Sequence, residues 1–160
     1  MKFKFDKAQE KDFNQICDLY KNVIKTTFTT WDDEYPSKKL IMEDIESGKL
    51  YLLKELNKIV AVSYLGKNEN EDENWTIKLK NPLGVARICV CPTMQKKGVG
   101  TYFMKQLIDT AKMMGADGMH FHVCTKNVSA MKMYENVGFI NCGLGKSNYG
   151  YDFYKYEMAF

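Results

Sequence analysis

The feature that most constrains the fold is a change in the spacing of apolar residues just past the middle of the chain. Residues 85–91 are mostly apolar, which indicates a strand, and Pro92 ends it because proline has no N–H to donate to a neighbouring strand. Apolar residues then recur at four-residue intervals over residues 98–114, which predicts a long amphipathic helix that ends at Gly115. A strand that leads into a long helix predicts a fold of mixed α and β structure.

Two helices are predicted before the first pair of strands. Apolar residues follow one helical face over residues 13–24, with Asp12 as the expected N-cap. Residues 26–35 interrupt this period with threonines, a tryptophan and an acidic run, so we expect a loop there. A second helix is expected to begin at Ser37 and to end at Gly48, because glycine adopts the left-handed C-terminal cap without strain.

The strand patterns predict a sheet. Residues 50–53 and 59–65 are rich in apolar and β-branched side chains, and we expect them to pair antiparallel through a hairpin in which Asn57 adopts a positive φ. Phe3 and Phe5 alternate with charged residues, which predicts a short edge strand. The C-terminal part is expected to add strands over residues 119–123, 139–141 and 151–158, with a short helix over residues 129–136 that ends at Gly138.

Two segments have a biased composition. Residues 67–82 form an acidic insertion that we expect to be solvated, although the alternation of Trp75, Ile77 and Leu79 favours the extension of a strand. The tail over residues 149–156 is rich in aromatic side chains, which predicts a strand packed on both faces. A binding-site wall or a dimer edge is the alternative for this tail, so a homodimer remains open.

Length and composition predict one domain over residues 1–160. The chain has 160 residues, of which 45% are hydrophobic and 27% are charged, a balance typical of a soluble globular protein. Its apolar runs stay well short of the ~20 residues that a membrane-spanning helix needs. The charged N-terminal residues lack the apolar segment of a signal peptide. We therefore expect a cytoplasmic protein that does not bind a membrane.

Charge and cysteine content exclude further classes of ligand. The formal net charge of +3 is too small, and the charged residues are too interspersed, to predict a nucleic-acid surface. The five cysteines are scattered over strand and helix patterns, which predicts reduced thiols in the core. Cys89 and Cys91 share one strand face, as do His120 and His122, but structural zinc sites use short loop-borne Cys motifs. We therefore expect no metal.

The turn between the central strand and the long helix is a candidate phosphate site. A helix N-terminus presents unpaired N–H groups and about half a positive charge, and glycine lets a phosphate approach the backbone closely. The run lacks the P-loop pattern, and a dinucleotide-binding fold would need a third glycine where Phe103 stands. A simple tight turn is the structural alternative. The candidate phosphate ligands are Gln95, Lys96, Lys97, Gly98, Val99, Gly100 and Thr101.

Two segments resemble the GNAT (Gcn5-related) N-acetyltransferase family. The first, Gln95-Lys96-Lys97-Gly98-Val99-Gly100, matches that family's Gln/Arg-x-x-Gly-x-Gly/Ala pyrophosphate loop. The second, Asn127-Val128-Ser129-Ala130-Met131-Lys132-Met133-Tyr134-Glu135-Asn136-Val137-Gly138-Phe139, is similar to its Asn-x-x-Ala-x-x-x-Tyr-x-x-x-Gly-Phe motif. The resemblance implies a GNAT fold of the α+β class, with about four helices and a mostly antiparallel central sheet of six to seven strands. The fourth and fifth strands of this sheet splay apart.

The resemblance also implies a cosubstrate and roles for particular residues. Acetyl-CoA would extend its pantetheine arm along the backbone of Ile88, Cys89 and Val90, and the Val90 N–H would stabilise the oxyanion. Asn127 would contact the cofactor arm, and Tyr134 would act beside the sulfur. A phenol with a pKa near ~10 transfers a proton to a thiolate of pKa ~8.5 only uphill, so Tyr134 is expected to donate a hydrogen bond instead.

The acceptor amine must lose a proton before it attacks, and the identity of the base stays open. Many members of the family carry a carboxylate on the fourth strand, whereas residues 85–89 have none. The candidates are Asp32, Asp33 and Glu34 in the first interhelical loop, His120 and His122, or a chain of water molecules.

The expected function is transfer of the acetyl group from acetyl-CoA to the primary amine of a small molecule, by direct attack within a ternary complex. A protein or peptide acceptor is one alternative, and a non-catalytic CoA-binding module is another. The hydroxyl of Tyr134 favours an enzyme, because a binding module has no need of a donor beside the sulfur.

Overall fold

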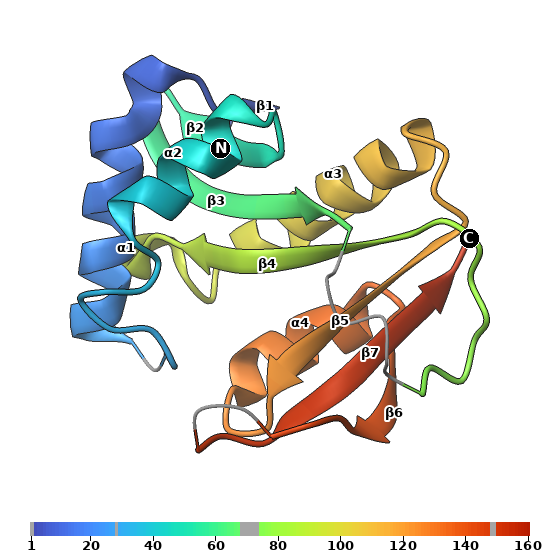
Figure 1. Cartoon of the computed structure of the whole chain (residues 1–160). Coiled ribbons are helices and arrows are strands. Elements are labelled where there is room, and N and C mark those ends of the chain that lie inside the picture. Colours follow the sequence, from blue (N-terminus) through green and yellow to red (C-terminus); the bar gives the residue numbers. More distant parts are fainter. Residues whose placement is uncertain (1, 28, 68–73, 148–149) are drawn as a thin grey trace. The chain divides into compact units, whose positions relative to one another are not determined.

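The chain contains both strands and helices along its length (Figure 1). The computed structural model describes residues 2–27, 29–67, 74–147 and 150–160. The strands in these ranges are β1 Phe3–Lys7, β2 Leu50–Glu55, β3 Lys58–Gly66, β4 Pro82–Val90, β5 Gly118–Cys124, β6 Ile140–Leu144 and β7 Phe153–Ala159. The helices are α1 Phe13–Thr26, α2 Lys38–Glu46, α3 Val99–Met113 and α4 Val128–Asn136, with short 3-10 helices at Glu10–Asp12 and Pro92–Met94.

The sheet is mixed, with the hydrogen-bonded strand order β1-β2-β3-β4-β5-β7-β6. β4 and β5 run parallel and pair at Pro82↔Gly118 and Leu83↔Met119, whereas β5 with β7, and β6 with β7, are antiparallel. The predicted α+β class, the sheet of six to seven strands and the four helices are confirmed for the described residues. β4 begins at Pro82 rather than at residue 85, because the first residue of a strand tolerates proline.

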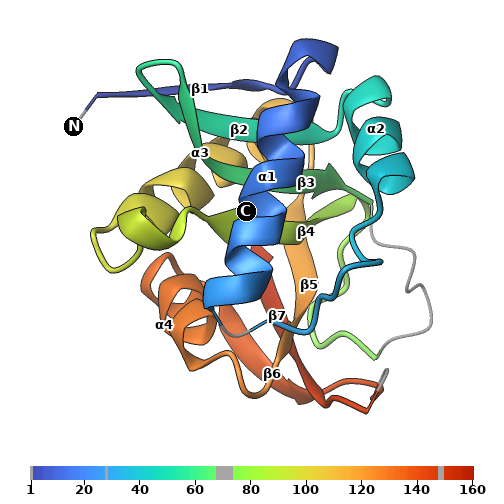
Figure 2. The same ribbon diagram turned by 90° about the vertical axis from the view of Figure 1, so that its left-hand side faces the viewer.

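The chain forms two compact units, which we call unit 1 (residues 1–65 and 86–103) and unit 2 (residues 66–85 and 104–160). In unit 1, β1 pairs antiparallel with β2, and β2 with β3. Figure 2 shows α1 in front of β2 and β3, with α2 beside it. α1 turns a helical stripe of apolar side chains into the core, and these buried residues are Ile16, Leu19, Tyr20 and Val23.

The ends of the first two helices follow local chemistry only in part. α2 begins next to Ser37, whose Oγ caps the helix by accepting a hydrogen bond from Leu40 N at 3.1 Å, and Gly48 follows α2 with the predicted positive φ of 70°. Asp12 stands at the N-cap position of α1, but its side chain does not cap that helix. Its carboxylate accepts hydrogen bonds from Gln9 N at 2.9 Å and from Lys54 Nζ at 2.8 Å instead.

The hairpin between β2 and β3 differs from the prediction at one residue. The positive φ falls on Leu56 (55°) and not on Asn57. Gln15 explains the difference, because its side chain donates to the Asn57 carbonyl at 3.3 Å and accepts from Ile59 N at 3.0 Å. These two bonds fix the orientation of the peptide groups around Asn57.

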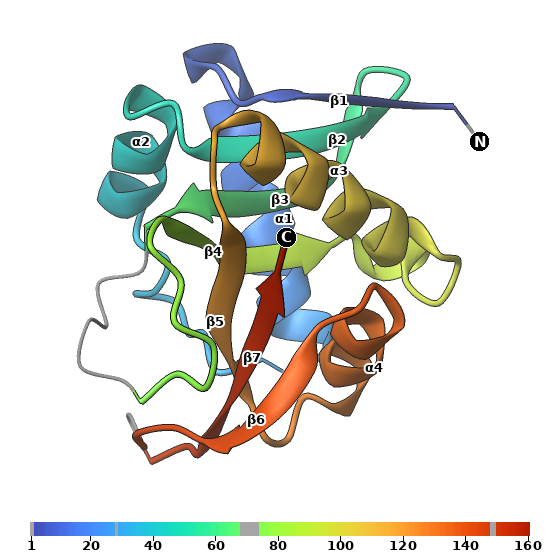
Figure 3. The same cartoon turned by 90° about the vertical axis from the view of Figure 1, so that its right-hand side faces the viewer.

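Unit 2 contains a sheet with two chemically different faces. Figure 3 shows β7 between β5 and β6, with α4 next to β6. One face is aromatic: Phe121 lies 4.7 Å from Tyr134 and 4.8 Å from Phe139 between ring centroids. The other face is polar, because side chains alternate along a strand and the register pairs His120 with Glu157 and His122 with Lys155.

Residues 74–81 cover the polar face of unit 2. The Trp75 ring stacks on His120 at 3.9 Å, and the buried Glu157 carboxylate accepts hydrogen bonds from Thr76 N at 2.6 Å and from Ile77 N at 3.3 Å. Residues 74–81 form no strand, so the alternative of a strand extended through Trp75, Ile77 and Leu79 is wrong. The N–H groups of Thr76 and Ile77 bind a carboxylate instead. The carboxylates at positions 69 and 71–73 of the insertion lie outside the described residues.

Candidate functional site

The loop between β4 and α3 bends through left-handed backbone at two positions. Lys96 has φ 60° and Gly98 has φ 81°, and a Cβ added at Gly98 would meet no other atom within 4 Å. The first helical hydrogen bond of α3 runs from Tyr102 N to the Gly98 carbonyl at 3.0 Å. The N–H groups at 99–101 precede that bond, as expected for the first turn of a helix, while the side chains of Lys96 and Lys97 are exposed.

Gln95 ties this loop to the end of β4. Its Nε2 donates a hydrogen bond to the Val90 carbonyl at 3.1 Å. Cys91 N donates to the Val60 carbonyl at 2.7 Å, which anchors the same end of β4 to β3. Gln95, expected as a cofactor-binding residue, thus uses its side-chain nitrogen to order the loop.

The strand that leads into the loop alternates in burial. Ile88 and Val90 are half-buried, and Cys89 is buried. Burial, and then the neighbouring Cys91, raise the pKa of the Cys89 thiol. Cys89 therefore stays a neutral thiol at physiological pH and is not activated as a nucleophile. The residues 88–101 lie together in unit 1 as one continuous strand and loop.

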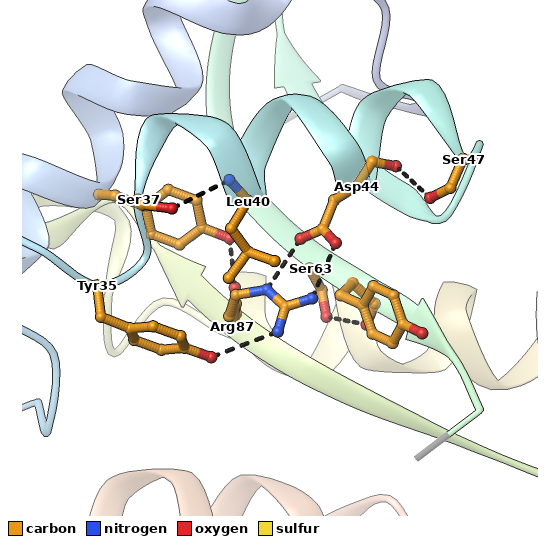
Figure 4. Close-up of polar contacts among 9 residues, drawn as sticks. Tyr35, Ser37, Leu40, Asp44, Ser47, Ser63 and Arg87 are labelled. Atoms are coloured by element: carbon orange, nitrogen blue, oxygen red, sulfur yellow. Dashed lines mark hydrogen bonds and ion pairs between the residues drawn. The ribbon is translucent and has the colours of Figure 1, made fainter. Parts of the chain in front are cut away.

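Arg87, which also lies on β4, is surrounded by a cluster of polar side chains (Figure 4). The Arg87 guanidinium donates to Asp44 on α2, with Nε to Oδ2 at 2.9 Å and Nη2 to Oδ1 at 3.0 Å. Its Nη1 donates to the Tyr35 hydroxyl at 3.4 Å, and these two partners raise the pKa of Arg87 against the opposing effect of burial. The Tyr20 hydroxyl donates to the Arg87 carbonyl at 2.6 Å.

The sequence interpretation missed this Arg87 cluster. Spacing gives no signal for it, because α2 and β4 are far apart in the chain. Two charges on apolar faces could have indicated it. Asp44 lies between the buried Ile41 and Ile45 of α2, and Arg87 stands within an apolar strand. A buried acid and a buried base usually pair, since an isolated charge is costly to bury.

In unit 2, α4 and the residue before it hold Tyr134 and Asn127 of the second motif. Asn127 caps this helix, because its Oδ1 accepts a hydrogen bond from Ala130 N at 3.2 Å. Tyr134 is 3% exposed and packs in the aromatic face, with ring centroids 6.0 Å from Tyr156. Burial, and to a smaller extent Tyr156, raise the pKa of the Tyr134 hydroxyl. The hydroxyl therefore keeps its proton and suits the role of a hydrogen-bond donor.

The candidate bases have different surroundings. In unit 1, Asp32, Asp33 and Glu34 are exposed, and Asp32 Oδ1 accepts hydrogen bonds from Glu34 N at 2.8 Å and from Tyr35 N at 2.9 Å. In unit 2, His120 and His122 are half-buried under Trp75, on the sheet face opposite to Tyr134. Burial lowers the pKa of His120, so its imidazole is neutral at pH 7, and the same shift makes it a weaker base.

All five cysteines are free thiols, as predicted, and four of them are buried. Across the described ranges, no three or more His, Cys, Asp or Glu side chains gather where a metal ion could be held. None of the helices described here has the length and the apolar character to cross a membrane.

Comparison with known proteins identifies related sequences and folds. The family model of the acetyltransferase (GNAT) family matches residues 16–139. The chain is also similar to the uncharacterized N-acetyltransferase YvbK of Bacillus subtilis (strain 168), with 27% identity over 104 residues. This match covers 65% of the chain and 61% of that relative, so the chain spans less than two thirds of its length.

Solved structures share the fold at low sequence identity. A GNAT-family acetyltransferase from Streptococcus agalactiae 2603 matches with a TM-score of 0.82 and 19% identity, over 99% of this chain and 95% of that one. The protein yncA of Salmonella typhimurium, solved with its cofactor acetyl-CoA, matches with a TM-score of 0.76 and 16% identity, over 98% and 93% of the two chains.

Proposed function

Because this chain belongs to the acetyltransferase (GNAT) family, we propose that it transfers the acetyl group of acetyl-CoA to the primary amine of a small molecule by direct attack within a ternary complex. Membership of the family makes the chain an acyltransferase with acetyl-CoA as its cosubstrate. The small-molecule acceptor and a single catalytic domain over residues 1–160 belong to the proposal. The observation that carries it is the left-handed loop at the N-terminus of α3.

The loop fits the pyrophosphate of acetyl-CoA. The space beside Gly98 is open, the first N–H groups of α3 are not used by the helix, and Lys96 and Lys97 add positive charge. The pantetheine arm is assigned to the backbone of β4. The proposed cofactor-binding residues are Ile88, Cys89, Val90, Gln95, Lys96, Lys97, Gly98, Val99, Gly100, Thr101, Asn127 and Tyr134.

Two groups are proposed to act in the chemical step. Acetyl-CoA supplies an activated acyl group whose leaving group is a thiolate. The Val90 N–H is assigned to the charge that develops on the carbonyl oxygen, because a backbone donor held by a strand needs no reorganisation. Tyr134 is assigned to the thiolate as a hydrogen-bond donor, and its raised pKa supports donation without full proton transfer.

The acceptor amine, with an ordinary pKa near ~10.4, must be deprotonated before it attacks. Asp33, Glu34, His120 and His122 stay as candidate bases, together with a chain of water molecules. Burial keeps the His120 imidazole in the neutral form that a base needs, but the lowered pKa also weakens it as a proton acceptor. A carboxylate base at Asp32 is less favoured, because its Oδ1 already holds two backbone N–H groups of its own loop.

The test is CoA release from acetyl-CoA in the presence of three acceptor panels: small amines and amino acids, short peptides with free N-termini, and lysine peptides. We expect saturable release with a member of the first panel. Release with peptides alone would replace the small-molecule acceptor by a peptide. Binding of acetyl-CoA without release from any panel would support a non-catalytic module.

A further inference from the structure

Arg87 adopts a backbone conformation that is rare for any side-chain-bearing residue within a strand. Its φ is 52°, in the left-handed region, whereas the residues of a regular strand have a strongly negative φ. Glycine usually occupies such positions, where the strand bends and redirects the groups that follow. A non-glycine residue stays there only when its surroundings hold it.

The surroundings of Arg87 hold both its backbone and its side chain. The Tyr20 hydroxyl of α1 donates a hydrogen bond to the Arg87 carbonyl at 2.6 Å, so a helix side chain holds this backbone group. Asp44 of α2 binds two guanidinium nitrogens, and the side chains of this pair are 12% and 7% exposed. Tyr64 of β3 presents its ring to the guanidinium at 4.7 Å, and Tyr35 lies at 3.4 Å (Figure 4).

We infer that Arg87 is a positioning residue for the cofactor strand. Four contacts from α1, α2, β3 and the loop before α2 fix the backbone turn at Arg87. That turn sets the direction of the peptide groups of Ile88, Cys89 and Val90, which follow directly. The inference rests on the proposed function, in which these peptide groups bind pantetheine and stabilise the oxyanion. Arg87 itself need not touch acetyl-CoA.

The choice of arginine fits this role better than a purely structural one. Glycine at position 87 would permit the same φ, but it would also permit many others. An arginine side chain restricts the backbone at position 87. Its planar guanidinium, with five donors, ties the backbone to α2, to the loop before α2 and to β3. Displacement of a reacting group by about 1 Å can lower a rate by about 100-fold, so a fixed strand has a direct catalytic value.

The test compares two buried ion pairs of unit 1. The double variant Arg87→Gly with Asp44→Asn removes the side-chain contacts that hold Arg87. Glycine keeps the left-handed φ accessible at position 87, and asparagine leaves no buried carboxylate without a partner. Lys54→Met with Asp12→Asn is the matched control, since that pair is also buried (20% and 6% exposed) but lies away from β4. We expect kcat/KM for acetyl-CoA to fall about 10- to 100-fold in the first variant only.

Hydrogen exchange provides the second readout. The amides at residues 88–90 should exchange faster in the Arg87 variant and at the wild-type rate in the control. Tyr20→Phe, a conservative change, should lower kcat/KM about fivefold, because it removes one hydrogen bond. Unchanged kcat/KM in the Arg87 and Tyr20 variants, or an equal loss in the control, would overturn the inference. A wild-type protein that releases no CoA would instead overturn the proposed function.

Discussion

Among single residues, Tyr134 is the proposed hydrogen-bond donor to the thiolate, and its surroundings support that role. The ring packs against Phe121 and Phe139 in a buried aromatic cluster, and the hydroxyl is the polar group of this side chain. Burial disfavours the phenolate and so raises its pKa. A residue of this kind can stabilise a neighbouring anion through a hydrogen bond without giving up its proton.

Tyr134→Phe keeps the packing and removes only the hydroxyl. We expect acetyl-CoA affinity to be unchanged and kcat to fall about 10- to 100-fold, the value of one hydrogen bond to a charged group. Steady-state kinetics at saturating acetyl-CoA measure this change. Tyr156→Phe is the matched control, because Tyr156 belongs to the same cluster and its hydroxyl donates to Glu135 at 3.1 Å. Equal kcat values for the wild type and the Tyr134 variant would remove Tyr134 from the catalytic residues.

Gly98 and Gly115 offer a second matched pair at the residue scale. Both have positive φ (81° and 87°), both face open space, and they flank the two ends of α3. Replacement of either by alanine should cost about 1 kcal/mol of stability through backbone strain. Only Gly98→Ala should weaken acetyl-CoA binding, by about tenfold or more, as measured by titration calorimetry. Equal affinities of the two variants would place the pyrophosphate elsewhere.

At the scale of elements, segment 74–81 depends on residues far away in sequence. Its backbone N–H groups bind the Glu157 carboxylate, and those of Lys80 and Asn81 bind Asp117 at 2.5 and 2.9 Å. Two backbone N–H groups hold the pKa of the Asp117 carboxyl below its ordinary value. The segment is therefore irregular and is held in place by hydrogen bonds to two carboxylates, Glu157 on β7 and Asp117 just before β5.

The stacking of Trp75 on His120 should make unit 2 sensitive to acid. Burial lowers the pKa of His120 in the folded state, so the unfolded state binds more protons near pH 6. This contribution to stability is complete above the unfolded value of ~6.5 and is lost as the pH falls toward the folded pKa. Urea unfolding between pH 7.5 and 5.0 should show falling stability. His120→Gln should flatten that slope, and an unchanged slope would assign it to other groups.

Local patterns predicted some elements well and failed where distant residues intervene. The start of α2 at Ser37, the left-handed cap at Gly48, the strand before Pro92 and the long helix depend on neighbours in sequence, and all were predicted. The prediction of a positive φ at Asn57 was wrong, because the Gln15 side chain holds the Asn57 carbonyl. The site followed the same rule: the spacing of Gly98 and Gly100 is visible in the sequence, whereas the pairing of α2 with β4 is not.

At the scale of the whole molecule, acetyl-CoA should stabilise the folded chain. A ligand at ~100 times its Kd adds about 2.7 kcal/mol to the free energy of unfolding. For a chain of this length that gain corresponds to a rise in Tm of roughly 5–10 °C. Thermal unfolding with and without millimolar acetyl-CoA measures it, and Gly98→Ala should reduce the shift. A Tm that does not respond to acetyl-CoA, with no heat of binding, would contradict the proposed cosubstrate.

The two compact units are interleaved along the chain, and this affects the order in which they form during synthesis. Unit 1 needs residues 86–103 to be complete, whereas residues 66–85 belong to unit 2 and leave the ribosome earlier. The first unit therefore cannot finish folding before part of the second has emerged. No single cut divides this chain into two independent fragments, so a split reporter or a circular permutant would have to preserve the continuity of both β4 and α3.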